Sequence, residues 1–127
     1  MKLTIAQAYN AGPHLKHIMN LGLKAKILYN LSKIQKVISE EAANYDKVRI
    51  ARLEELSEKD ENGKSIITKE GSYQLSVDNQ SIFQEEMEVL QRQEVEIVGT
   101  PIQIKDIEDV VGLTATTFNV LDWLFVE

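Results

Sequence analysis

The chain has only two histidines, His14 and His17. On a helix a spacing of three residues places both imidazole rings on one side, within reach of a single metal ion. A metal site needs at least one further ligand, and the nearest acidic residues in the sequence are Glu40 and Glu41. We therefore interpret both histidines as ordinary surface or boundary residues and expect no metal site.

The acidic segment Glu58–Gly63 is the second candidate for chemistry. It has oxygen-bearing side chains at the first, third and fifth positions and glycine at the sixth, as a calcium-binding loop does. The twelfth position, where such a loop carries a bidentate glutamate, is Lys69. A charged turn that ends a helix explains the same residues without an ion.

Paired glutamates occur at positions 40–41, 54–55 and 85–86. Adjacent side chains on a helix point about 100° apart, so none of these pairs is a general acid and base as it stands. The sequence has no nucleophile-elbow serine, no glycine-rich phosphate loop and no cysteine. We therefore expect neither an enzyme nor a bound cofactor.

Length and composition indicate one domain over residues 1–127. The chain is 43% hydrophobic and 27% charged, which suits a core that needs no disulfide or metal. Its longest uncharged stretches, Leu3–Leu15 and Val110–Leu121, are shorter than the roughly 20 residues of a membrane span. The start does not resemble a secretion signal. The expected location is therefore the cytoplasm.

Charge is divided unevenly along the chain. Residues 1–39 contain six lysines and no acid, whereas residues 40–127 contain eight basic and twenty acidic residues. Either the two segments lie side by side in the fold, or each offers a surface to a partner, phosphate for the first and a basic protein for the second. Nucleic-acid binding is disfavoured because the basic stretch has no arginine and the whole chain carries a charge of −6. Its contacts would be Lys16, Lys24, Lys26, Lys33 and Lys36.

The main structural element is a helix from Leu23 to about Ser57, a segment without proline or glycine. At 1.5 Å per residue it would be roughly 50 Å long, longer than a small domain is wide. Part of it must therefore project or be covered by a returning helix. Its apolar stripe, with gaps of three and four residues, consists of Leu23, Ile27, Leu31, Ile34, Ile38, Ala42, Tyr45 and Val48.

Shorter elements flank this helix. A capping box at Thr4–Gln7 predicts a short helix that fails near Gly12–Pro13, followed by a second short helix. Beyond the long helix we expect a β-hairpin, formed by residues 65–68 and 73–77, and then a helix from Asp78 or Asn79 to about Arg92. Strands at 94–98 and 102–104 should follow, with an acidic turn at 106–109. A last helix should be capped by Thr114 or Thr116. The predicted fold is α+β, mainly α: a long, coiled-coil-like helical hairpin with a small β-hairpin at its tip, short strands and a C-terminal helix.

The C-terminal segment concentrates aromatic residues, including the only tryptophan. Buried aromatic anchors dominate both cores and interfaces. The segment is therefore either part of the core or a groove for a partner or a second copy. As candidate partner-binding residues we name Phe118, Leu121, Trp123 and Phe125.

The order of these segments resembles that of small, uncharacterised helical-hairpin proteins encoded by tailed phages and prophages. The resemblance covers about residues 23–125 and is most particular at Glu58–Lys64, Glu94–Ile97, Pro101–Asp109 and the Leu113–Thr114 start of the last helix. It carries no catalytic residues. It implies a viral setting, with the protein in the host cytoplasm or the virion, and a binding role.

Two functions follow from this resemblance and from the absence of catalytic motifs. The first is a non-enzymatic interaction module, associated with the virion or with its assembly, that binds a host or phage protein or a second copy of itself. The alternative is an inhibitor of a host anti-phage defence protein that acts by binding and occlusion, using its acidic surface. Neither function needs a membrane or a cofactor.

Overall fold

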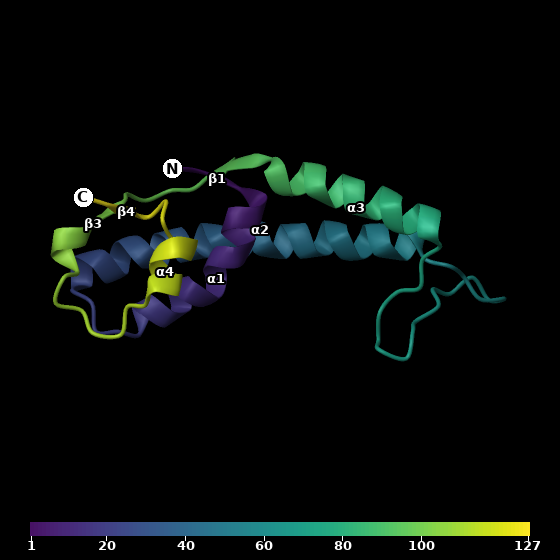
Figure 1. The fold of residues 1–127 in the computed structure, drawn as a ribbon, viewed down its shortest axis with the longest axis horizontal. Helices are drawn as coiled ribbons and strands as arrows, with labels where there is room; N and C mark the ends of the chain where they lie inside the picture. Colours follow the sequence, from purple (N-terminus) through teal and green to yellow (C-terminus); the bar gives the residue numbers. More distant parts are fainter.

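The computed structural model describes all residues 1–127 and is mainly helical, as the sequence predicts (Figure 1). Its elements in chain order are β1 (Lys2–Thr4), α1 (Ile5–Met19), α2 (Ala25–Leu56), α3 (Val77–Arg92), β2 (Glu94–Glu96), β3 (Ile102–Gln103), the 3₁₀ turn η1 (Ile104–Asp106), α4 (Ala115–Val120) and β4 (Phe125–Val126). None of the helices combines the length and apolarity needed to cross a membrane.

The long helix α2 is the spine of the molecule, and the prediction of an unbroken helix over this segment is confirmed. Figure 1 shows α1 crossing the first half of α2 and α3 running back along its second half. We call the part built on the first half the body. The second half of α2 from residue 46, the connection 57–76 and α3 form the arm, residues 46–92, which projects from the body.

The body holds the main core. A single cluster of thirteen buried apolar side chains joins α1, the first half of α2 and the segments after β2. Within α2 the predicted stripe is buried at Leu31, Ile34, Ile38 and Tyr45. The stripe prediction is wrong at Val48, which is half exposed because the body ends before it and α3 covers a neighbouring side of the helix.

Helix α1 is continuous through Gly12 and Pro13, so the predicted break is wrong. Proline inside a helix removes one backbone hydrogen bond and costs about 3 kcal/mol. Pro13 lies on the exposed side, while buried side chains continue on the other side at Ala11 and Leu15. Burial across the proline therefore outweighs the lost bond. The predicted capping box is confirmed, since Thr4 and Gln7 bond each other's backbone N–H groups.

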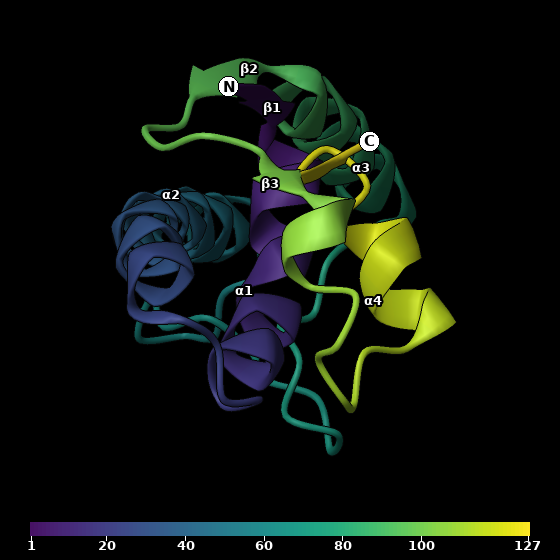
Figure 2. The same ribbon diagram turned by 90° about the vertical axis from the view of Figure 1, so that its left-hand side faces the viewer.

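Two small strand pairs close the body, as the view along α2 in Figure 2 shows. β1 pairs with β2 in antiparallel register, with Leu3 opposite Val95, and β3 pairs with β4 in parallel. The N-terminal strand was not predicted, because three residues are too few to show the alternation of apolar and polar side chains that indicates a strand. The segment between β2 and β3 lies beside the first half of α2, where Thr100 exchanges two hydrogen bonds with Asn30.

The C-terminal segment differs from the single apolar helix that was predicted. Thr114 caps α4 as expected, but the helix ends at Val120. Trp123 lies in the following turn and Phe125 in β4, whose strand pairing turns the chain back over the core. Because the chain is no longer helical after Val120, Leu121 and Leu124 can both be completely buried.

The connection 57–76 at the end of the arm is a reduced hairpin. Only two isolated bridges form, Lys59 with Ser65 and Ile67 with Tyr73, and neither predicted strand is present. Two strands without a covered apolar face are marginally stable, which accounts for the short ladder. The predicted position at the tip of the helices is nevertheless correct (Figure 1). α3 is capped by Ser76, two residues before the earliest predicted cap.

Candidate functional site: the projecting arm

The residues considered for metal binding do not converge. No group of three or more histidine, cysteine or acidic side chains is placed to hold a metal ion. His17 Nε2 lies 3.2 Å from the carbonyl oxygen of Gly112. In the acidic turn, the Asp60 carboxylate accepts the backbone N–H groups of Asn62 and Lys64 at 2.9 and 3.0 Å, so it stabilises the turn itself.

The four C-terminal candidates for partner binding lie together against the main core. Leu121 is completely buried, and Phe118, Trp123 and Phe125 are partly buried around it. The Phe118 and Phe125 rings contact each other with centroids 4.8 Å apart. The indole Nε1 of Trp123 is buried without an acceptor. Their role in binding stays a prediction, and the geometry favours the core interpretation.

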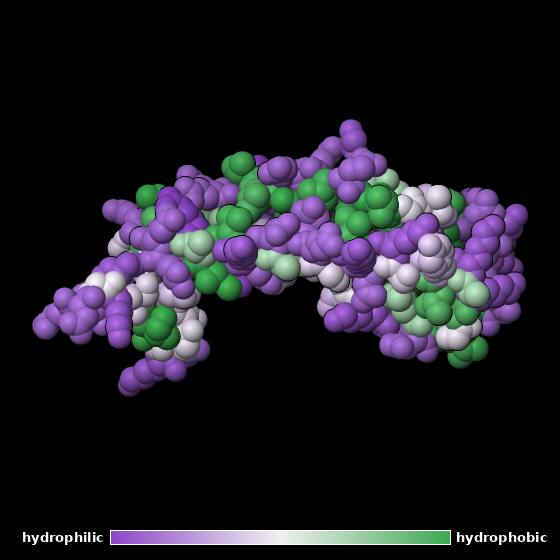
Figure 3. Space-filling model, turned by 180° about the vertical axis from the view of Figure 1, so that it is seen from behind, coloured by the Kyte–Doolittle hydropathy of each residue, from purple (hydrophilic) through white to green (hydrophobic).

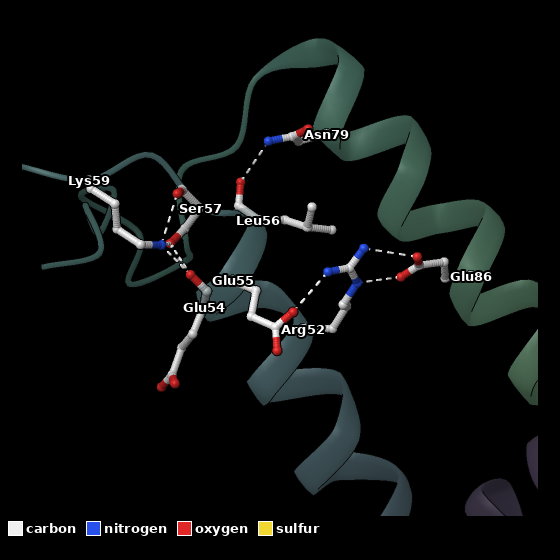
Figure 4. Close-up of polar contacts among 8 residues, drawn as sticks. All are labelled: Arg52, Glu54, Glu55, Leu56, Ser57, Lys59, Asn79 and Glu86. Carbon is white, nitrogen blue, oxygen red and sulfur yellow. Dashed lines mark hydrogen bonds and ion pairs between the residues drawn. The ribbon is translucent and has the colours of Figure 1, made fainter. Parts of the chain in front are cut away.

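An ion-pair network fixes α3 against α2 in the arm (Figure 4). The Arg52 guanidinium donates to both carboxylate oxygens of Glu86, at 2.5 and 2.9 Å, and to Glu55 at 2.9 Å. These bonds raise the pKa of Arg52, and the bonds from Arg52 lower the pKa of Glu86. A bidentate contact of this kind fixes both the register and the rotation of the two helices.

Polar contacts also close the far end of α2 (Figure 4). The Lys59 ammonium donates to the carbonyl oxygens of Glu54 and Ser57, which belong to the last turn, and to the Ser57 hydroxyl. Asn79 of α3 donates to the carbonyl oxygen of Leu56 at 3.0 Å. A cation at this position complements the negative end of the helix dipole. The end of the arm is thus held by hydrogen bonds, with little apolar burial.

A small joint connects the arm to the body. Ile5, Tyr45 and Met87 form a separate three-residue core, and Gln91 donates to the Tyr45 hydroxyl at 2.7 Å. Beside the joint is a hollow of about 250 Å³. On its rim the Tyr9 hydroxyl donates to Asp46, whose negative charge raises the pKa of Tyr9. The joint positions the arm relative to the body.

One side of the arm exposes apolar side chains. Val48, Ile82 and Val89 are 50%, 41% and 69% exposed. Val48 lies one helical turn before Arg52, and Ile82 and Val89 lie one turn before and after Glu86. All three therefore lie on the side of the helix pair that carries the ion pair. We call this side the arm face, made of Val48, Arg52, Ile82, Glu86 and Val89.

The space-filling view from behind shows hydrophobic side chains in several patches along the length of the molecule, separated by polar side chains (Figure 3). Exposed apolar surface with a polar rim is typical of interaction sites. The sequence offered one signal for this surface, the seven-residue spacing of Ile82 and Val89, which gives two apolar side chains on one side of α3. Periodicity alone assigned Val48 to the core.

Comparison with protein-family models, with curated protein sequences and with solved structures gives no match. The resemblance to phage and prophage proteins therefore stays a prediction that rests on the order of the segments.

Proposed function

We propose that the chain is a non-enzymatic protein–protein interaction module that binds another protein through the arm face. The observation that carries this proposal is the exposure of Val48, Ile82 and Val89 on two helices that a bidentate ion pair holds in one arrangement. A preorganised apolar surface of this kind binds a partner at a low cost in conformational entropy. A phage or prophage setting, in the virion or in its assembly, accords with this role.

The stability of the arm does not explain why Ile82 and Val89 are apolar and exposed. α3 contains a single buried residue, Met87, among its sixteen. Its apolar residues Ile82 and Val89 lie on the side away from that burial, where polar residues would be better solvated. A partner that covers this side would explain both their presence and their alignment.

Affinity purification of the tagged full-length chain from its host cell tests the proposal. We expect the double variant Ile82→Asn/Val89→Asn to lose proteins that the unchanged chain retains. The matched control is Val111→Asn, which alters an 86% exposed valine far from the arm and should retain them. Circular dichroism of all three chains shows whether the helices are intact. Retention of the same proteins by the arm-face variant would contradict the proposal.

The alternative function, occlusion of a host defence protein, uses the same surface and stays a prediction. It is favoured by the charge of the arm, which has eleven acidic and seven basic residues between 46 and 92. Expression in cells that carry a defence system, followed by phage challenge, tests it. Loss of protection with the unchanged chain but not with Ile82→Asn/Val89→Asn would support occlusion through the arm face, and unchanged protection would count against it.

A further inference from the structure

We propose that the outer edge of β2 binds an extended, basic segment of another protein, which joins the strand pair β1–β2 as a third, antiparallel strand. The edge continues one residue beyond β2, and we call Glu94, Glu96 and Val98 the β2 edge. The segment that fits it has an apolar residue followed by two basic residues on alternate positions. This surface is separate from the arm face, so the inference does not depend on the proposed function.

The backbone of the β2 edge has hydrogen-bonding groups that the chain itself does not use. In an antiparallel pair, residues that bond the partner strand alternate with residues that face away from it. Ile97 donates to the carbonyl oxygen of Met1 at 2.7 Å, and Ile5 donates to that of Gln93 at 2.9 Å. The odd-numbered residues from 93 to 97 therefore bond β1. The N–H and C=O groups of the β2 edge point the other way and have no partner within the chain.

The opposite edge of the strand pair is closed. There the Thr4 N–H donates to the Gln7 side chain at 2.9 Å, and the chain turns into α1 at Ile5. No segment covers the edge of β2. Figures 1 and 2 both show this strand at the upper border of the molecule, with β1 between it and α1. An exposed strand edge of this kind is a template on which another strand can pair.

Burial on the inner side holds the β2 edge in place. Val95 packs against both apolar clusters, and Ile97 is completely buried. The alternate residues Glu94 and Glu96 are exposed, and Val98 is 53% exposed. A strand that is already ordered pairs with another at a low cost in conformational entropy.

The side chains of the edge select a basic partner. Residues directly opposite each other in an antiparallel pair carry their side chains on the same face of the sheet, where opposite charges stabilise the pairing. The Glu94 carboxylate makes no salt bridge, and that of Glu96 contacts only the N-terminal ammonium at 3.2 Å. Lys2 lies opposite Glu96 on β1 and makes no ion pair. Two basic residues opposite the glutamates, and an apolar one opposite Val98, therefore complement the edge.

A second copy of this chain does not complement the edge. A two-fold axis through Val95 would place Glu94 of each copy opposite Glu96 of the other. An axis through Glu96 would place the two Glu96 carboxylates opposite each other. Like charges in these positions destabilise a sheet and protect an exposed edge from pairing with itself. The same carboxylates attract a basic strand.

Binding of short peptides to the full-length chain tests the proposal, with backbone amide shifts in NMR as the readout. The probe, the lysine peptide, has a valine and then two lysines on alternate positions, with threonines between them. It should shift the amides of Glu94, Glu96 and Val98. We expect it to bind at least ~10-fold more tightly than a control peptide with glutamates in place of the lysines.

N-methylated peptides distinguish strand pairing from attraction between charges alone. The valine and lysine amides of the probe would face β2, so their N-methylation should abolish binding. The threonine amides would face away from β2, so their N-methylation should leave binding in place.

Charge reversal in the chain tests which residues select the peptide. Glu94→Lys/Glu96→Lys should lose the lysine peptide and bind the glutamate peptide instead. The matched control Glu61→Lys/Glu70→Lys makes the same change of charge at exposed positions of the connection 57–76 and should bind as the unchanged chain does. Circular dichroism of both variants shows whether the helices are intact.

Equal binding of the lysine and glutamate peptides would overturn the proposal, as would equal binding of the two N-methylated peptides. Absence of amide shifts at the β2 edge with the lysine peptide would also overturn it. The arm-face variant Ile82→Asn/Val89→Asn should bind the lysine peptide normally. Failure of the proposed function and failure of this inference are therefore distinguishable.

Discussion

The body and the arm are built from the same long helix but are held together by different interactions. In the body, thirteen buried apolar side chains from α1, α2 and the C-terminal segments form one cluster. In the arm, α3 buries only Met87, with Phe83 and Leu90 partly buried beside it, and hydrogen bonds with Arg52 and Leu56 fix it to α2. The body is thus stabilised by burial, and the arm is oriented by polar contacts.

This difference indicates where the molecule has stability and where it keeps a surface available. Burying a leucine or isoleucine side chain stabilises a fold by about 1.5–3 kcal/mol, whereas exposed ion pairs contribute little. Regions with few buried apolar contacts open locally at a lower free energy than the core. We therefore expect the arm of an isolated chain to open before the body unfolds, and a partner on the arm face to suppress this opening.

The largest effect should come from removing a core side chain of the body. Leu15 is completely buried, so Leu15→Ala should lower the free energy of unfolding by about 3–4 kcal/mol through lost burial and the cavity left behind. Met87→Ala in the arm should cost about 2 kcal/mol, the low end of the range for such a truncation, because its small cluster has only three buried members. Urea denaturation followed by circular dichroism measures both.

Hydrogen exchange locates the two effects. Met87→Ala should accelerate exchange of the α3 amides and leave those of α1 beyond its first turn unchanged, whereas Leu15→Ala should accelerate both. Equal costs for the two substitutions, or acceleration of α1 exchange beyond the first turn by Met87→Ala, would show that the arm and the body unfold as one unit.

The same difference explains which parts of the fold the sequence could predict. Helix α2 was predictable because its apolar period of three to four residues persists where neighbours cover it. The exposure of Val48 was not predictable, because the apolar spacing of the helix continues unchanged through this residue. Only the extent of the body determines which residues of the stripe are covered. Periodicity identifies a side of a helix that can be buried, and tertiary contacts determine how much of it is.

Two other differences between the sequence predictions and the structure have local causes. The break predicted at Gly12–Pro13 follows from backbone propensity, which burial on the opposite side of α1 overrides. The candidate site was predicted at the aromatic residues because aromatic side chains dominate interfaces and cores alike. The sequence could not show that Leu121 and its neighbours would contact α1 and α2 while smaller apolar residues of the arm stayed exposed.

An intermediate effect should come from glycines with positive φ, one in the body and one in the arm. Gly99 has φ of 114°, and a Cβ there would lie 2.5 Å from Cγ1 of Ile34. Gly99→Ala should therefore cost about 2–3 kcal/mol, from backbone strain and from displacement of a core side chain. Gly63 has φ of 77° with no atom within 4 Å of a Cβ, so Gly63→Ala carries the strain alone, about 1 kcal/mol.

Denaturation of the two alanine variants in parallel measures the difference. Gly99→Ala should also change exchange at amides around Ile34, since the displaced side chain belongs to the main cluster. Gly63→Ala should affect only the connection at the end of the arm. A larger loss of unfolding free energy for Gly63→Ala than for Gly99→Ala would mean that the arm contributes more to stability than its burial indicates.

The smallest effect should be the response of the arm to acid. Hydrogen bonds from Arg52 lower the pKa of Glu86 below its ordinary value of 4.5, so the charged carboxylate is favoured in the folded arm. Its contribution to stability is complete above the ordinary pKa and is lost as the pH falls through the lowered value. Protonation of Glu86 should therefore weaken the contact of α3 with α2 slightly, because the bonds of Asn79 and Gln91 and the burial of Met87 remain.

An NMR titration of the Glu86 side-chain carboxyl checks this prediction directly. Its midpoint should lie lower in the unchanged chain than in Arg52→Gln, because the variant removes the guanidinium that donates to both carboxylate oxygens. Arg49→Gln is the matched control, since Arg49 pairs with Asp46 within α2 and should leave the Glu86 midpoint in place. Equal midpoints in all three chains would show that the ion pair does not persist in solution. The arm face would then lack the fixed helix register on which its binding surface depends, whereas the body, held by apolar burial, would be unaffected.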